Sequence, residues 1–170
     1  MSSKDKVDKL ELDKVPSADG MSIHIAFSEW NQAITGKLLD GALSVLTQKG
    51  LKESEITVMK VRGTFELPVA AKSLLKHKTA DAVICLGCVI KGETEHDLFI
   101  NQSVATSLNQ LAITSTKPMI FGVLTVNSME QAEDRAGGKY GNKGEEAAVT
   151  AIKMVTALKD LCKPTKTIGF

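Results

Sequence analysis

The chain has 170 residues, of which 43% are hydrophobic and 24% charged, the proportions of an ordinary globular protein. At about 150 residues per domain this length favours one domain, large enough to fold without disulfides or a metal. Its 21 basic and 20 acidic side chains leave a net charge of +1, which excludes a strong field for nucleic acid or an anionic membrane. The longest apolar run, 82–90, is far shorter than the roughly 20 residues of a membrane-spanning helix.

The N-terminal residues 1–20 alternate lysine with aspartate and glutamate, and they contain no apolar stretch typical of a secretion signal. We expect a flexible, solvated arm here, punctuated by Pro16 and Gly20, ahead of one domain over 21–162. Residues 163–170 are expected to form a short tail, because Pro164 stops the last helix.

The first half of the domain indicates two strands, each followed by a helix. A strand-like run at 22–27 precedes Asn31, which is expected to cap a helix that ends at Gly50. The β-branched run at 56–61 predicts the second strand. Pro68 then fits the first turn of the second helix.

The second half of the domain continues this alternation. Residues 83–90 form a nearly continuous apolar run, typical of a strand in a sheet covered on both faces. Apolar residues at helical spacing over 100–111 predict a helix, and 118–126 predicts a fourth strand. Four strands that alternate with helices favour right-handed βαβ units, and so an α/β fold with a four-stranded parallel sheet between helices.

After the fourth strand, Ser128 is expected to cap a short helix that carries Arg135. Four glycines in 136–144 predict a loop, and their spacing matches neither common phosphate-binding glycine pattern. A last helix has its apolar residues over 148–158.

Cys85 and Cys88 have the C-x-x-C spacing of a redox or zinc half-site. Both fall in the apolar run, where the thiols would lie along a strand, and no second pair of ligands completes a zinc site. We therefore expect free, buried cysteines, no metal, and a reducing compartment such as the cytoplasm.

Ligands of parallel α/β sheets bind at the carboxyl ends of the strands. At that edge of the sheet, the side chain of Trp30 would stack on a flat ring of a ligand, or it would instead pack under a helix. Glu66 would accept bonds from ligand hydroxyls, or serve as an ordinary first-turn acid. His96 follows a glycine-containing turn suited to an anion, where it would transfer protons or merely cap a helix. Arg135 is a candidate phosphate donor.

Five segments in register resemble the 6,7-dimethyl-8-ribityllumazine synthase family of riboflavin biosynthesis. They are F-S-E-W-N (27–31), R-G-T-F-E-L-P (62–68), G-C-V-I-K-G-E-T-E-H (87–96), P-M-I-F-G-V-L-T (118–125) and E-Q-A-E-D-R-A-G-G-K-Y-G-N-K-G (130–144). The resemblance implies a flavodoxin-like three-layer sandwich and a transferase without cofactor or metal. Its reaction would condense 5-amino-6-(D-ribitylamino)uracil with 3,4-dihydroxy-2-butanone 4-phosphate to 6,7-dimethyl-8-ribityllumazine, phosphate and water.

The resemblance also implies roles for the residues after the first two strands. Trp30 would stack on the pyrimidine, with Asn31 beside it at the edge of the site. Thr64, Phe65 and Glu66 would hold the ribityl chain and the adjoining ring.

After the third strand, Val89 and Ile90 would form the wall and the backbone donors for the pyrimidine. Glu93 and Thr94 match the turn whose backbone N–H groups hold the phosphate, with Arg135 as the charged partner.

His96 would be the proton-transfer residue, and Phe121 and Lys143 would come from the adjacent subunit of a homopentamer. The short glycine-rich segment resembles that of members whose pentamers assemble, twelve at a time, into an icosahedral shell. No nucleic acid or membrane partner is implied.

Three positions depart from the family pattern. Trp30 stands where phenylalanine is more common, and it keeps a flat apolar face. Arg62 replaces the usual proline, and the acid expected two residues after His96 is Asp97, one residue after it. The shifted acid leaves open a homologue that binds lumazine or flavin without turnover. A flavodoxin-like signalling or electron-transfer domain is disfavoured, because Asp81 precedes its strand and so lies at the wrong edge.

Overall fold

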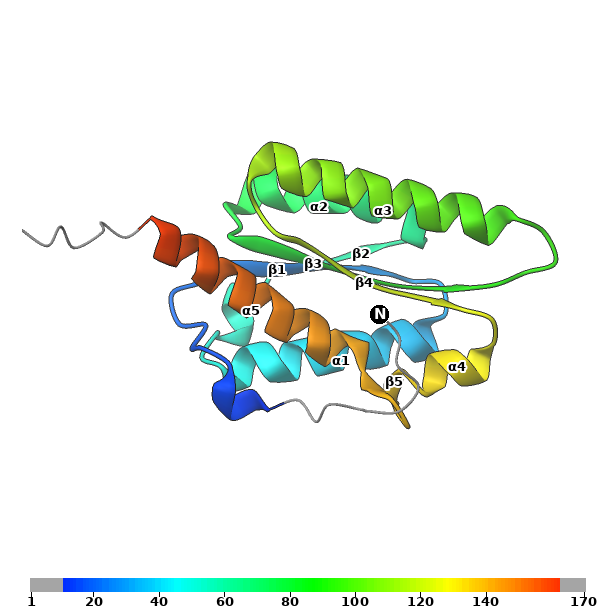
Figure 1. The fold of residues 1–170 in the computed structure, drawn as a ribbon, viewed down its shortest axis with the longest axis horizontal. Coiled ribbons are helices and arrows are strands. Elements are labelled where there is room, and N and C mark those ends of the chain that lie inside the picture. The colour runs from blue at the N-terminus through cyan, green and yellow to red at the C-terminus, as the bar shows by residue number, and fades with distance from the viewer. Residues whose placement is uncertain (1–10, 163–170) are drawn as a thin grey trace, which may run out of the picture.

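The computed structural model describes residues 11–162, and its centre is one parallel sheet (Figure 1). The strands are β1 (Ile23–Ser28), β2 (Val58–Val61), β3 (Ala82–Ile90) and β4 (Met119–Val126), in the order β2-β1-β3-β4. All neighbouring pairs run parallel, which confirms the predicted four-stranded sheet. The outer strand β2 is two residues shorter than predicted.

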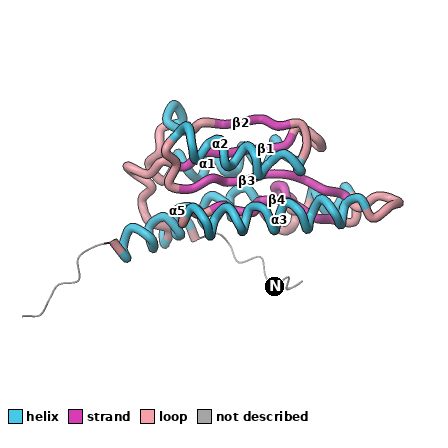
Figure 2. The backbone as a smooth tube through the Cα atoms, turned by 90° about the horizontal axis from the view of Figure 1, so that it is seen from above, coloured by secondary structure: helices cyan, strands magenta, loops and turns pink. Residues whose placement is uncertain are grey.

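Helices cover both faces of this sheet, as predicted. Figure 1 shows α2 (Leu67–Lys78) and α3 (His96–Ser115) on one face, and α1 (Gln32–Gln48) and α5 (Lys143–Leu161) on the other. Figure 2, seen from above, shows the strands in the order β2, β1, β3 and β4. The short α4 (Met129–Glu133) follows β4, and the side chain of Ser128 caps it as expected. Single 3₁₀ turns occur at η1 (Leu12–Lys14), η2 (Glu53–Glu55) and η3 (Thr64–Glu66).

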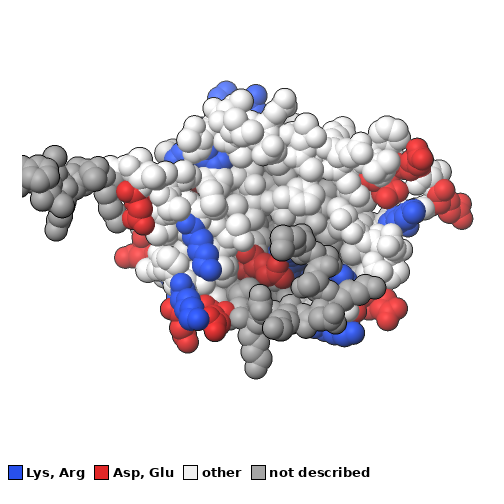
Figure 3. All heavy atoms as spheres, in the orientation of Figure 1, with Lys and Arg blue, Asp and Glu red and all other residues white. Residues whose placement is uncertain are grey.

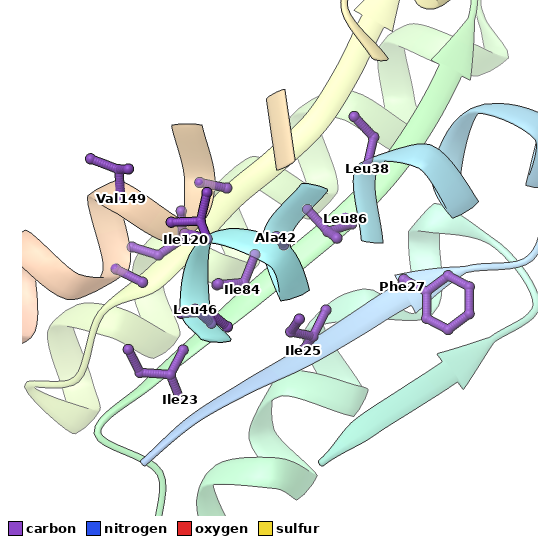
Figure 4. Packing of buried hydrophobic residues seen from close by; sticks show 14 of the residues in the cluster. Ile23, Ile25, Phe27, Leu38, Ala42, Leu46, Ile84, Leu86, Ile120 and Val149 are labelled. Atoms are coloured by element: carbon purple, nitrogen blue, oxygen red, sulfur yellow. The ribbon is translucent and has the colours of Figure 1, made fainter. Parts of the chain in front are cut away.

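The core has two halves because successive side chains of a strand point to opposite faces of the sheet. Ile23, Ile25 and Phe27 of β1 lie in the half that contains α1 and α5, as Figure 4 shows. Ala26 lies in the half that contains α2 and α3. β3 is a central strand with helices against both of its faces, which explains its continuous apolar sequence.

The glycine-rich segment after β4 is more ordered than the predicted loop. It forms a hairpin of β5 (Ala136–Gly138) and β6 (Gly141–Asn142), with φ of +106° at Gly137 and +76° at Gly141. Glycine adopts these angles without steric cost, which allows so short a hairpin. The helix expected to carry Arg135 ends two residues before it, at Glu133.

This hairpin places the start of α5 in very close contact with α1. A Cβ on Gly144 would lie 1.9 Å from the carbonyl oxygen of Leu38, so only glycine fits at this crossing. The side chain of Asn142 joins the two helices, because its Nδ2 donates to the Lys37 carbonyl over 2.8 Å. Its Oδ1 accepts from the Gly144 N–H over 2.8 Å and caps α5.

The segment before β1 is attached to the domain at two buried positions, although most of residues 11–20 are exposed as predicted. Val15 and Ala18 are buried, and the Ala18 N–H donates to the Lys49 carbonyl over 2.7 Å. The rest of the predicted arm, 1–10, and the predicted tail with Pro164 lie outside the described residues. Within 11–162, none of the helices has the length and apolar character needed to cross a membrane.

Candidate active site

A cavity of about 670 Å³ opens at the carboxyl edge of the sheet, where the strand ends of β1, β2 and β3 meet the start of α3. Both the size and the place are those of a small-molecule site in this class of fold. Nine residues predicted from the sequence line it: Trp30, Asn31, Thr64, Phe65, Glu66, Val89, Ile90, Thr94 and His96.

Trp30 lies at the cavity rather than under a helix. Its side chain is 52% exposed and borders the opening. A Cβ on Gly63 would lie 3.5 Å from Trp30 Cε3, so the indole rests against the backbone of Gly63. The ring therefore presents an apolar face to a ligand, supported by the loop after β2.

Asn31 does not cap α1 with its side chain, contrary to prediction. Its backbone is left-handed, with φ 58° and ψ 44°, a conformation that asparagine tolerates better than most residues. The side-chain Nδ2 instead donates to the Cys88 carbonyl over 2.9 Å. The amide thus connects the start of α1 to β3 at the base of the cavity.

The loop after β2 is closed by Glu66. Its Oε2 accepts the N–H of Gly63 over 2.8 Å, while the residue lines the cavity. A Cβ on Gly63 would lie only 2.9 Å from that oxygen, so a larger residue here would displace the carboxylate from this hydrogen bond. Thr64 is buried, and its Oγ1 would lie 2.8 Å from a Cβ on Gly87. The absence of a side chain at Gly87 therefore allows the loop after β2 to pack against β3.

The turn after β3 leads directly into α3. Thr94 Oγ1 accepts the backbone N–H of His96, the first residue of α3, over 3.4 Å. Gly92 and Thr94 line the cavity, whereas the exposed Glu93 between them does not. Backbone N–H groups at the start of a helix of 20 residues favour an anion at this point.

His96 and Asp97 both line the cavity at the start of α3. His96 is exposed, and within residues 11–162 its imidazole ring accepts or donates no hydrogen bond. The shifted acid therefore does not hold the ring within one chain. The imidazole remains free to contact a ligand.

Seven further residues line the cavity that were not predicted as site residues from the sequence: Arg62, Gly63, Cys88, Gly92, Asp97, Phe99 and Ile100. Phe99 is 65% exposed, although an apolar residue in a helix suggests a core position. Burial raises the pKa of the Cys88 thiol to about 11, so this thiol is no nucleophile at neutral pH.

Cys85 and Cys88 are free and buried, as predicted. Burial raises the pKa of Cys85 to about 12. Among residues 11–162, no three His, Cys, Asp or Glu side chains are grouped in a way that would hold a metal ion.

Arg135, Phe121 and Lys143 lie away from this cavity. Arg135 follows α4, donates to the Gln131 carbonyl over 3.0 Å, and has its guanidinium 4.8 Å from the centre of the Tyr140 ring. Phe121 and Lys143 line a separate hollow of about 240 Å³ between the outer strand β4 and α5. One chain does not unite all the residues that were predicted to act together.

Comparisons with known proteins agree with one another. The model of the 6,7-dimethyl-8-ribityllumazine synthase family matches residues 20–159. A protein of that name from Parabacteroides distasonis is 50% identical over 145 residues, which cover 85% of this chain and 91% of the relative. One from Bacteroides fragilis is 49% identical over 143 residues, 84% of this chain and 100% of the relative. One from Thermus thermophilus is 43% identical over 152 residues, 89% and 97% of the two chains.

Proposed function

The chain belongs to the 6,7-dimethyl-8-ribityllumazine synthase family, and on this premise we propose that its cavity is one half of an active site completed by a neighbouring copy. The protein makes 6,7-dimethyl-8-ribityllumazine in riboflavin biosynthesis, from 5-amino-6-(D-ribitylamino)uracil and 3,4-dihydroxy-2-butanone 4-phosphate. We assign it to the transferases, because a four-carbon unit passes to the pyrimidine as phosphate leaves.

The cavity suits the pyrimidine substrate. The indole of Trp30 offers a flat surface, and the end of β3 at Val89 and Ile90 offers backbone groups at the edge of a stacked ring. The Glu66 carboxylate accepts hydrogen bonds beside it, as ribityl hydroxyls require, and Thr64 and Phe65 complete that side. The pairing of an aromatic ring with strand ends and a carboxylate in one cavity is the observation that carries this assignment.

The phosphorylated substrate is assigned to the turn before α3. Backbone N–H groups around Gly92, Glu93 and Thr94 and the helix dipole favour its phosphate. His96 is the proton-transfer group, because imine formation moves protons to a carbonyl oxygen and water leaves. Phosphate is then eliminated, and the second ring closes when the ribitylamino nitrogen attacks the remaining carbonyl carbon and a second water leaves. Holding the two reactants together contributes much of the acceleration.

The other half of the site is assigned to a neighbouring subunit. Phe121 of β4, and Arg135 and Lys143 that follow it in the chain, lie outside the cavity of their own chain and are therefore available to a neighbouring one. Arg135 would supply the bidentate guanidinium for the phosphate.

A homopentamer is the proposed assembly. Figure 3 shows few charged side chains over α3, and exposed apolar residues on α2 and α3 support a subunit contact there. They are Val69, Leu98, Phe99 and Ile113. The tight β5–β6 hairpin is consistent with an icosahedral shell of twelve pentamers. Light scattering distinguishes monomer, pentamer and shell.

The cytoplasm is the proposed location. The free thiols of Cys85, Cys88 and Cys162 support a reducing compartment.

A condensation assay tests the function. Purified protein is mixed with both substrates, and lumazine fluorescence is followed above the uncatalysed rate. We expect a clear acceleration that is lost in His96→Ala. Tight binding of lumazine without acceleration would contradict the proposal and indicate a binding protein.

A further inference from the structure

The rim of the cavity continues the pairing of β1 with β2 beyond the sheet. The last paired residues are Ser28 and Val61. The N–H of Glu29 then donates to the Val61 carbonyl over 2.8 Å, and the N–H of Trp30 donates to the Arg62 carbonyl over 3.2 Å. The segment that carries the indole is thus attached directly to the loop that begins the other wall.

Glu29 reinforces this connection with its side chain. Its Oε1 lies 3.1 Å from Lys60 Nζ, and its Oε2 lies 3.2 Å from Arg62 Nη1. Hydrogen bonds from Lys60 and then Arg62 hold the pKa of Glu29 below its ordinary value, so the carboxylate is ionised at neutral pH. One carboxylate, 32% exposed, therefore joins two cations of the neighbouring strand end.

The two cations would otherwise repel each other. Lys60 and Arg62 are two residues apart in an extended segment, so their side chains leave the same face. Arg62 lies at the cavity opening and directly precedes Gly63, whose backbone supports the indole of Trp30. A shift of Arg62 would therefore move the surface on which the indole rests.

We propose that Glu29 is a positioning residue for the pyrimidine site. By pairing with Lys60 and Arg62, it keeps the loop after β2 in place and thereby fixes the plane of the Trp30 ring. Glu29 does not line the cavity, so it acts through Trp30 and not on the substrate. This inference rests on the proposed function, in which Trp30 stacks on 5-amino-6-(D-ribitylamino)uracil.

Fluorescence tests the proposal directly, because Trp30 is the single tryptophan of the chain. In Glu29→Gln we expect acrylamide to quench Trp30 about twofold more strongly in the absence of substrate, since the ring is less well held. In the same variant KM for the pyrimidine should rise about threefold to tenfold, while kcat and KM for the phosphorylated substrate change by less than about twofold.

Glu55→Gln is the matched control. Glu55 also pairs with a lysine, Lys52, over 3.4 Å, but at the opposite end of β2. The Glu55→Gln variant loses the same charge as Glu29→Gln, and it should change neither the acrylamide quenching of Trp30 nor the KM for the pyrimidine. Glu29→Asp keeps the charge and should restore most of the wild-type quenching.

Unchanged quenching and unchanged pyrimidine KM in Glu29→Gln would overturn the proposal. If that variant fails to fold, Arg62→Gln provides a second test. It removes one of the two cations that pair with the Glu29 carboxylate, and acrylamide must then quench Trp30 more strongly than in the wild-type protein. Failure of the wild-type protein to condense its substrates would count against the proposed function, and quenching would still decide whether Glu29 positions the indole.

Discussion

The side-chain amide of Asn31 donates to the backbone carbonyl of Cys88 over 2.9 Å, joining two segments 57 residues apart. This bond couples the residue directly before α1 to the third residue from the end of β3. Asn31 makes this bond from a left-handed backbone, with φ 58°. Asn31 and Cys88 both line the cavity, so this one amide group joins two parts of its wall.

Substitutions at Asn31 separate the hydrogen bond from the backbone conformation. Asn31→Gly tolerates the left-handed angles and loses only the bond, which should lower the free energy of unfolding by about 1 kcal/mol. Asn31→Ala also forces alanine into the left-handed region, at about 1 kcal/mol more. Urea denaturation at one protein concentration measures both. Equal stability of the two variants would contradict the backbone part of this explanation.

Gly144→Ala should be severely destabilising. Its Cβ would lie 1.9 Å from the Leu38 carbonyl oxygen. The Cβ position is fixed by the backbone of residue 144 and the oxygen belongs to the backbone of Leu38, so neither atom can turn away, and α1 and α5 must separate. We expect a loss of about 3 kcal/mol in the free energy of unfolding, or no folded protein. Gly36→Ala is the control. Gly36 lies in α1, and a Cβ at this position would have no neighbour within 4 Å. Because alanine favours the helix more than glycine does, this variant should raise the free energy of unfolding by up to about 1 kcal/mol.

His24 makes stability depend on pH far from the cavity. Its Nδ1 accepts the Thr57 N–H over 3.1 Å, which requires an unprotonated nitrogen. Burial lowers the pKa of His24, the bond to the Lys78 carbonyl raises it, and the charge of Lys78 lowers it again, leaving a pKa below the usual value. As the pH falls, the His24 side chain of the unfolded chain therefore binds a proton at a higher pH than that of the folded chain. The contribution of neutral His24 to the free energy of unfolding is complete above about pH 6.5 and is lost as the pH falls below that value.

His24→Gln keeps an acceptor for Thr57 but removes the titration. The free energy of unfolding should then decline less steeply between pH 7 and 5 than in wild type, by at most about 1.4 kcal/mol per pH unit. The exposed His77 provides the control, since His77→Gln should retain the wild-type slope. An unchanged slope in His24→Gln would contradict the assignment.

His96→Ala should lower kcat by about a hundredfold, because proton transfer to the carbonyl and hydroxyl groups loses its donor. The oligomer should stay intact, since His96 is exposed and its ring makes no hydrogen bond within residues 11–162. Stopped-flow fluorescence and light scattering measure the two effects. A wild-type rate in this variant would remove the role assigned to His96.

The parts of the fold that follow from local sequence were predictable. β3 and β4 stand out as apolar runs because most of their residues are buried, whereas no residue of β2 is fully buried, and this strand was predicted two residues too long. The β5–β6 hairpin was missed because a glycine-rich segment gives no alternation of apolar and polar residues.

The site was predictable where βαβ geometry brings strand ends together, which placed Trp30, Glu66 and His96 at one edge. The side-chain bond of Asn31 was not, because its partner lies on a distant strand. Phe99 and Ile100 look like core residues in a helical pattern, and only the structure shows them at the opening. Arg135 lies outside the cavity of its own chain, a separation that no motif reveals.

A mixed-oligomer experiment tests the shared site most directly. His96→Ala and Arg135→Ala are each purified, unfolded together in equal amounts and refolded, then compared with each variant refolded alone. If each site takes His96 from one chain and Arg135 from its neighbour, random mixing restores about a quarter of the sites, and the mixture regains condensation activity that neither variant has. If both residues must come from the same chain, no mixture regains activity, and the proposed division of the site between subunits is contradicted.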